Sequence, residues 1–207
     1  MPVSASTFSI IFVLGAPGAG KGTLCTHLAR IHNLVHFSVG DTLRAYRKAN
    51  PDTPLAAIIE NKLENQGFLT SSELGPFLDQ AIKDAGTTAN GILIDGFPRC
   101  KEQAESFDEK SGYRPDAVLK VVVEKEKAKM RYLSRGRDSN DSAEKFEKRF
   151  AEYERESPPV EKLYVDAGIL MEVDANGTKE ENLEVLMKNL NESDLWQRII
   201  AKGTSAA

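Results

Sequence analysis

The stretch GAPGAGKGT, from Gly15 to Thr23, constrains the fold of this chain more than any other feature. It places four glycines, a proline and a lysine directly after the apolar run IIFVL. Glycine weakens regular structure, so a cluster of this kind indicates a backbone that something approaches closely. Residues Phe8 to Leu14 are expected to form a buried strand, and Leu24, Leu28 and Ile31 share one helical face after the loop. A strand, a glycine loop and a helix in this order open an α/β unit.

The loop follows the general phosphate-binding pattern G-x-x-x-x-G-K-[ST], except that residue 22 is glycine and the hydroxyl comes one place later, at Thr23. Backbone N–H groups and the positive end of the following helix would face bound phosphates. Lys21 would reach the outer phosphates, and Thr23 would lie near a magnesium ion. The nucleotide-binding residues expected here are Gly18, Ala19, Gly20, Lys21, Gly22 and Thr23.

The rest of the chain alternates short apolar runs with amphipathic or charged stretches. After a short apolar piece, LVHFSVG, residues 41–70 are expected to be helical and polar, broken at NPDTP. Further strands are expected at 91–95, 118–124 and 169–173, and further helices at 71–85, 125–135, 142–157 and 179–190. The motif SPPV is expected to end the helix at 157, and the tail after residue 190 to be weakly structured at its tip, KGTSAA. Strands that alternate with helices predict a parallel sheet covered on both faces.

Composition narrows the class of protein. A length of 207 residues suits one domain, and a net charge of −4 argues against a nucleic-acid partner. The two cysteines, Cys25 and Cys100, lack a CxxC spacing, so free thiols in a reducing compartment are expected. His27, His32 and His36 are interpreted as structural or surface residues, because no Cys or acidic partner stands at ligand spacing. No segment approaches the about 18 apolar residues of a membrane span, and the first residues lack the basic region of a signal peptide, so a cytoplasmic protein without a membrane partner is expected.

A second motif, IDGFPR, ends the apolar run at 91–95. An aspartate at this place, Asp95, is suited to hold magnesium beside a phosphate loop. Gly96 allows a ligand to come close, and Arg99 presents a planar fork that matches phosphate.

Three motifs together carry a resemblance: GAPGAGKGT, SVGDTLR at 38–44 and DGFPRCKEQ at 95–103. With them the chain resembles the nucleoside-monophosphate kinases, which include adenylate kinase and UMP-CMP kinase, from about residue 8 to 190. The resemblance implies a three-layer P-loop NTPase fold with a core of residues 1–37, 71–133 and 143–190, a helical insertion at 38–70 that binds the monophosphate, a lid at 134–142 and a tail at 191–207. It also implies a monomer that transfers the γ-phosphate of ATP reversibly to a nucleoside monophosphate, with Mg²⁺ as cofactor.

The same resemblance implies the residues of the acceptor site. Arg44 and Arg99 would hold the phosphate of the acceptor, and Asp41 would shape the loop that faces its base. Ser71 stands where the family usually has a proline, which leaves the shape of the neighbouring loop undefined. The acceptor-binding residues expected are Ser38, Val39, Gly40, Arg44, Gly67, Leu69, Gly96, Arg99, Gln103, Arg137 and Arg149.

Arg131 and Arg135 lie four residues apart, so they share a helical face on which like charges repel. The residues alone leave two interpretations open, an anion site and a solvated basic face relieved by Glu124 and Glu126. The family resemblance favours the first, with a short lid that has no zinc-binding insert. It implies Lys21, Arg99, Arg131, Arg137 and Arg149 as catalytic cations, and it adds Arg135 and Gly177 to the ATP-binding residues.

Which base the acceptor monophosphate carries is a separate question. An amide at Gln103 offers one donor and one acceptor to an adenine edge, which favours AMP. Val39 has no hydroxyl to offer a base, and UMP or CMP stays as the alternative. Two alternative functions come from other classes of protein. One is an inactive nucleotide sensor on the same fold, and the other is a small-metabolite kinase, a class that lacks DGFPR.

Overall fold

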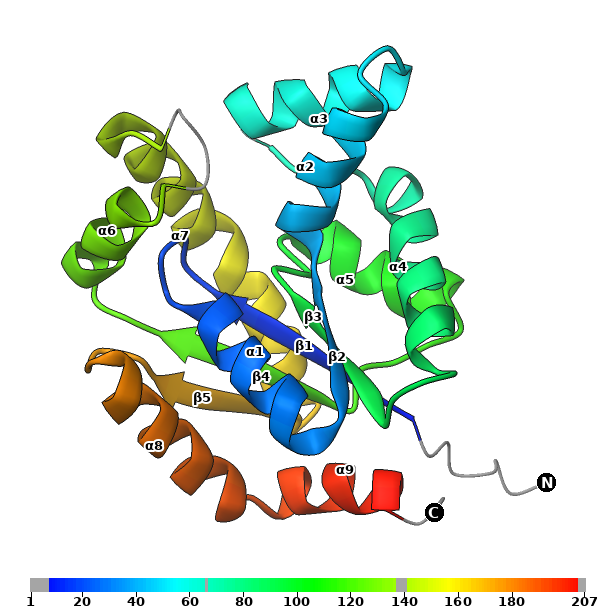
Figure 1. Cartoon of the computed structure of the whole chain (residues 1–207), viewed down its shortest axis with the longest axis vertical. Coiled ribbons are helices and arrows are strands. Elements are labelled where there is room, and N and C mark those ends of the chain that lie inside the picture. Colours follow the sequence, from blue (N-terminus) through cyan, green and yellow to red (C-terminus); the bar gives the residue numbers. More distant parts are fainter. Residues whose placement is uncertain (1–7, 66, 137–140, 205–207) are drawn as a thin grey trace.

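The computed structural model of the chain describes residues 8–65, 67–136 and 141–204. In these residues five parallel strands form one sheet in the order β2-β3-β1-β4-β5 (Figure 1). The strands are β1 (Ser9–Gly15), β2 (Leu34–Ser38), β3 (Gly91–Asp95), β4 (Ala117–Val122) and β5 (Leu170–Asp174). The apolar piece LVHFSVG therefore contributes an outer strand, and GILID is the third strand along the chain.

The central strand β1 is buried along nearly its whole length because helices cover both of its faces. Ile10, Phe12 and Leu14 point into one apolar cluster, and Ile11 and Val13 into the other. This alternation follows from the two-residue period of a strand. The expected α/β fold with two covered faces is confirmed.

The helices divide between these clusters. α1 (Lys21–His32), α6 (Lys125–Ser134), α8 (Lys179–Asn191) and α9 (Asp194–Thr204) pack on one side, and α4 (Ser71–Ala85) and α5 (Lys101–Lys110) on the other. The helix α7 (Ala143–Asp166) contributes to both clusters. Two further helices, α2 (Val39–Ala49) and α3 (Pro54–Asn65), project beyond the carboxyl ends of the strands (Figure 1).

The expectation that SPPV ends a helix at residue 157 is wrong. α7 continues through Pro158 and Pro159 to Asp166. Each proline removes one N–H, but both side chains are exposed, so the carbonyls left without a helical donor lie on the solvent side. Val160 and Tyr164 are 1% and 4% exposed, and their burial holds the second half of the helix on the sheet.

The tail is helical as far as Thr204, and residues 205–207 of the expected weakly structured tip lie outside the described residues. Trp196 within α9 is completely buried in the core. Lys202, which belongs to the tip KGTSAA, pairs with Asp116 at 2.5 Å. The other carboxylate oxygen of Asp116 accepts a hydrogen bond from Ile10 N at 2.9 Å, so the helix is linked to the start of β1.

Both cysteines are free thiols, as expected: Cys25 is buried and Cys100 is partly buried. Among the described helices, none combines the length and the apolar character that a membrane crossing requires.

Candidate functional site

A cavity of about 500 Å³ opens at the carboxyl ends of the strands. It is lined by the glycine loop, by residues of α2 and α3, by the DGFPR segment and by side chains of α6 and α7. Ligands of open parallel sheets bind at this edge, outside the carboxyl ends of the strands. The first two sequence motifs therefore meet in one place, although about 70 residues separate them along the chain.

The glycine loop packs tightly against its surroundings. Gly18 has φ +82°, and a Cβ there would lie 2.0 Å from the carbonyl oxygen of Ala128 on α6. α1 begins directly after the loop, with Gly20 as its N-cap and without a side-chain cap or an acidic residue in its first turn. The first N–H groups of a helix have no intrahelical acceptor, so this end is suited to bind an anion.

Lys21 turns back onto this loop. Its ammonium donates to the carbonyl oxygens of Gly15 and Ala16, at 2.8 and 3.0 Å. Loss of hydration lowers the pKa of Lys21 to about 8, although Asp95 opposes the shift. A negatively charged ligand in the cavity would favour the protonated form.

Asp95 ends β3 and is only 8% exposed. Burial by itself would raise its pKa, but the hydrogen bond with His36 and the charge of Lys21 outweigh it, so the pKa lies below the usual value. His36 Nε2 lies 3.4 Å from Asp95 Oδ2. His36 therefore has an acidic partner that the spacing of residues in the sequence did not indicate, because that partner comes from a neighbouring strand.

Arg99 follows the DGFP turn after β3 and lines the cavity. Its Nε donates to the carbonyl oxygen of Gly96 at 2.9 Å, which aims the guanidinium across the loop. The protein atoms around it reduce its hydration, and together with the charge of Arg149 they lower its pKa to about 10. Arg99 nevertheless remains exposed to solvent, and at neutral pH its guanidinium is charged.

Gln103 is 2% exposed and joins two segments of the site. Its Oε1 accepts from the backbone N–H of Arg99, and its Nε2 donates to the carbonyl oxygen of Leu69, each at 2.8 Å. An amide has two donor hydrogens and two acceptor lone pairs, so after these two bonds the side chain keeps one further hydrogen and one further lone pair.

The α2 side of the cavity carries the third motif. Ser38 caps α2, and its Oγ accepts from the backbone N–H of Asp41 at 3.3 Å. Arg44 pairs with Asp41 one turn earlier in the same helix, and Val39 is buried beside them. Six of the expected acceptor residues line the cavity on this side of the molecule: Ser38, Val39, Gly40, Arg44, Gly67 and Leu69.

The arginines of α6, its C-cap and α7 are held by protein groups. Arg131 donates to the carbonyl oxygens of Ala175 and Gly177, both at 2.7 Å. Arg135 stacks on the ring of Tyr132, with its Cζ 4.1 Å from the centroid, and pairs with Asp141 at 3.1 Å.

Arg149 Nη1 approaches Tyr132 Oη at 3.4 Å. Arg131, Arg135 and Arg149 all line the cavity, whereas Arg137 and residues 138–140 of the expected lid lie outside the described residues.

Sequence reasoning missed several residues that line the cavity. Glu152 on α7 accepts a hydrogen bond from the backbone N–H of Gly67 at 3.0 Å. Its position three residues after Arg149 on one helix is a signal that could have placed it on the same face. Asn182 on α8 accepts from the backbone N–H of Gly177 at 2.8 Å, and no pattern in the sequence indicates it.

Known proteins resemble this chain over most of its length. The adenylate kinase family model matches residues 13–169. The chain is 32% identical over 212 residues to UMP-CMP kinase 1 of Oryza sativa subsp. japonica, covering 100% of this chain and 85% of the relative. It is 35% identical over 180 residues to the adenylate kinase of a Nitratiruptor species, covering 83% of this chain and 90% of the relative. It is 34% identical over 181 residues to adenylate kinase isoenzyme 1 of Gallus gallus, covering 83% of this chain and 89% of the relative.

Proposed function

The chain belongs to the adenylate kinase family of nucleoside-monophosphate kinases, and on that premise we propose that it transfers the γ-phosphate of ATP reversibly to AMP, with Mg²⁺ as cofactor. The observation that carries the proposal is a single cavity with the glycine loop in one half and Arg44, Arg99 and Gln103 in the other. Transfer between two phosphates requires both to lie in line within one enclosed site.

The donor half is assigned to ATP. The uncapped start of α1, the loop amides and Lys21 would bind its phosphates. Arg131 holds the carbonyls of Ala175 and Gly177, which supports a rigid turn beside the nucleotide. Lys21 would leave those two loop carbonyls that it now contacts in order to reach the phosphates.

The acceptor half is assigned to the monophosphate. Arg99 and Arg149 lie close enough that the charge of Arg149 lowers the pKa of Arg99, and Arg44 adds a smaller effect in the same direction. A phosphate dianion would relieve this repulsion, and arginine forks match its geometry. The three charges therefore supply binding energy that an uncharged ligand could not use.

The donor set fits magnesium, a hard cation that prefers oxygen ligands. Asp95 presents a carboxylate that is held in its ionised form, and Thr23 presents an exposed hydroxyl in the first turn of α1. Both residues line the cavity. When bound, the ion would neutralise charge on the β- and γ-phosphates.

The chemistry needs no general base, because the attacking atom is already a phosphate oxygen. The chain contributes position and positive charge, through Lys21, Arg99, Arg131, Arg137 and Arg149. The site must also exclude water, or ATP would be hydrolysed. We assign the exclusion of water to closure of the 38–70 insertion and the 134–142 segment over the substrates. Amide hydrogen exchange in both segments that is unchanged by a two-nucleotide inhibitor would contradict this assignment.

The choice of base rests on Gln103. Its remaining donor and acceptor capacity supports adenine, and its hydrogen bond to Leu69 supports a fixed orientation toward the acceptor pocket. UMP or CMP is the second candidate, favoured by Val39, which offers no hydroxyl to a purine.

The test is formation of ADP from ATP and Mg²⁺ with AMP, UMP, CMP and GMP offered in parallel. A kcat/KM for AMP at least tenfold above the others supports Gln103 as the reader of the base. Preference for UMP or CMP overturns AMP in favour of the second candidate. Binding of ATP without turnover of any acceptor would contradict the kinase and support an inactive nucleotide sensor.

A further inference from the structure

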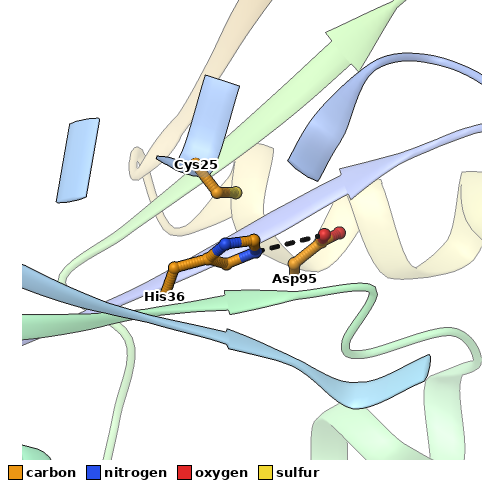
Figure 2. Close-up of side chains that lie close together, drawn as sticks. All are labelled: Cys25, His36 and Asp95. Carbon is orange, nitrogen blue, oxygen red and sulfur yellow. Dashed lines mark hydrogen bonds and ion pairs between the residues drawn. The ribbon is translucent and has the colours of Figure 1, made fainter. Parts of the chain in front are cut away.

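A thiol, an imidazole and a carboxylate lie close together beside the sheet. Figure 2 shows Cys25, His36 and Asp95 directed toward one another from α1, β2 and β3. One ligand atom of each lies within 4.8 Å of the other two. Cys25 and His36 have no part in the phosphoryl transfer proposed above.

The cluster is well shielded. Cys25 is 1% exposed, and the side chains of His36 and Asp95 are 20% and 9% exposed. Burial and the charge of Asp95 raise the pKa of the Cys25 thiol, so without a metal this sulfur is protonated. The carboxylate is ionised and supplies negative charge to attract a cation.

The donor types indicate which cation fits. Sulfur and imidazole nitrogen discriminate against Mg²⁺, whereas one sulfur, one nitrogen and one oxygen suit Zn²⁺. Zinc bonds of about 2.0–2.3 Å would require these atoms to move inward by roughly 1 Å, within the reach of side-chain rotation. Three protein ligands leave a fourth position, and Asp95 faces the catalytic cavity.

We propose that Cys25, His36 and Asp95 form an inhibitory zinc site next to the catalytic cavity, which Asp95 lines. Binding forms a zinc–sulfur bond and releases the thiol proton of Cys25 to solvent, so the thiolate and the carboxylate together balance the charge of the ion. The zinc would hold the carboxylate of Asp95 that we assign to magnesium. Zinc at the site and productive MgATP would therefore exclude each other.

Zinc binding is tested on the full chain without nucleotide, so this part of the test is independent of the proposed kinase activity. Calorimetric titration with Zn²⁺ should give one equivalent, with about one proton released per metal. Co²⁺ as a spectroscopic probe should produce a thiolate-to-cobalt charge-transfer band and the strong visible bands of tetrahedral cobalt. Absence of both signals overturns the site.

The matched variants are Cys25→Ala and His36→Gln, with Cys100→Ser and His27→Gln as controls from outside the cluster. We expect the first pair to weaken zinc binding by at least about tenfold to a hundredfold and the controls to leave it unchanged. If Cys25→Ala fails to fold, His36→Gln still decides. Equal binding in all four variants would overturn the proposal.

Inhibition is tested separately, at fixed MgATP with free zinc set by a chelating buffer. Zinc should reduce turnover of the wild type, chelator should restore it, and the half-inhibitory concentration should rise tenfold or more in His36→Gln. Zinc bound by the wild type without loss of turnover would overturn the inhibitory role.

Discussion

The carboxylate of Glu152 accepts a hydrogen bond from the backbone N–H of Gly67, 85 residues earlier, at 3.0 Å. This contact joins α7 to the segment between α3 and α4, next to the acceptor half of the cavity. Burial raises the pKa of Glu152, although the hydrogen bond from Gly67 and then the charges of Arg99, Arg155 and Arg149 oppose the shift. Glu152 thus lies near Arg99 and Arg149, the arginines that we assign to the acceptor phosphate.

Glu152→Gln keeps an acceptor for Gly67 and removes the negative charge of the carboxylate. We expect the KM for the monophosphate to fall about threefold to tenfold, corresponding to roughly 1 kcal/mol, the upper end for a partly exposed charge. The KM for ATP should change little. The matched control is Glu154→Gln, because Glu154 is an exposed carboxylate on the same helix. A higher KM for the monophosphate in Glu152→Gln would contradict the idea that the charge of Glu152 weakens phosphate binding.

The same variant has a pH signature in stability. The pKa of Glu152 is higher in the folded protein than in the unfolded chain, so the folded protein binds this proton more tightly. The stability that the bound proton contributes is lost as the pH rises through the folded pKa. Glutamine does not titrate. The Tm of Glu152→Gln should exceed that of the wild type at neutral pH, and the difference should shrink as the pH falls toward the ordinary glutamate pKa. A difference independent of pH would show that charge is not its cause.

Arg99→Ala should reduce kcat/KM for the acceptor by about 10³, since one arginine at a transferred phosphoryl group can contribute 10³–10⁵ in rate. Binding of ATP in the donor half should remain within about threefold, and the far-ultraviolet circular dichroism should be unchanged. Arg155→Ala is the control, because that side chain is 68% exposed and pairs with Glu156. Full activity of Arg99→Ala would remove Arg99 from the acceptor site.

Arg131→Ala should act through the loop that Arg131 holds. Its guanidinium spans the carbonyls of Ala175 and Gly177, and each hydrogen bond to a charged group contributes about 1.5–3 kcal/mol. We expect the KM for ATP to rise at least about tenfold, with little recovery in Arg131→Lys, because an ammonium lacks the planar fork. Lys127→Ala is the control. Because Arg131 is also one of the catalytic cations proposed above, kcat should fall as well. An unchanged KM for ATP would contradict the role of Arg131 in holding the loop.

Trp196→Ala should destabilise the whole fold. Trp196 is completely buried, and removal of such a side chain costs about 3–5 kcal/mol. The midpoint of urea unfolding should fall accordingly, whereas Arg198→Ala on the exposed side of α9 should change the free energy of unfolding by less than about 0.5 kcal/mol. A small effect of Trp196→Ala would mean that the tail adds little to the core.

Local patterns in the sequence predicted the parts of this protein that depend on neighbours along the chain. The glycine spacing from Gly15 to Gly22, the apolar runs of β1 and β3 and the DGFPR segment each encode their own conformation. In a parallel sheet the carboxyl ends of strands share one edge, so the meeting of these motifs in one cavity also follows from the sequence.

Only the tertiary structure decided the contacts between distant residues. His36 has a carboxylate partner because β2 pairs with β3, with Ser38 opposite Asp95. α7 passes two prolines because Val160 and Tyr164 are buried beyond them, and α9 is ordered because Trp196 enters the core. In each case a long-range burial or charge pair outweighs the local preference of the chain.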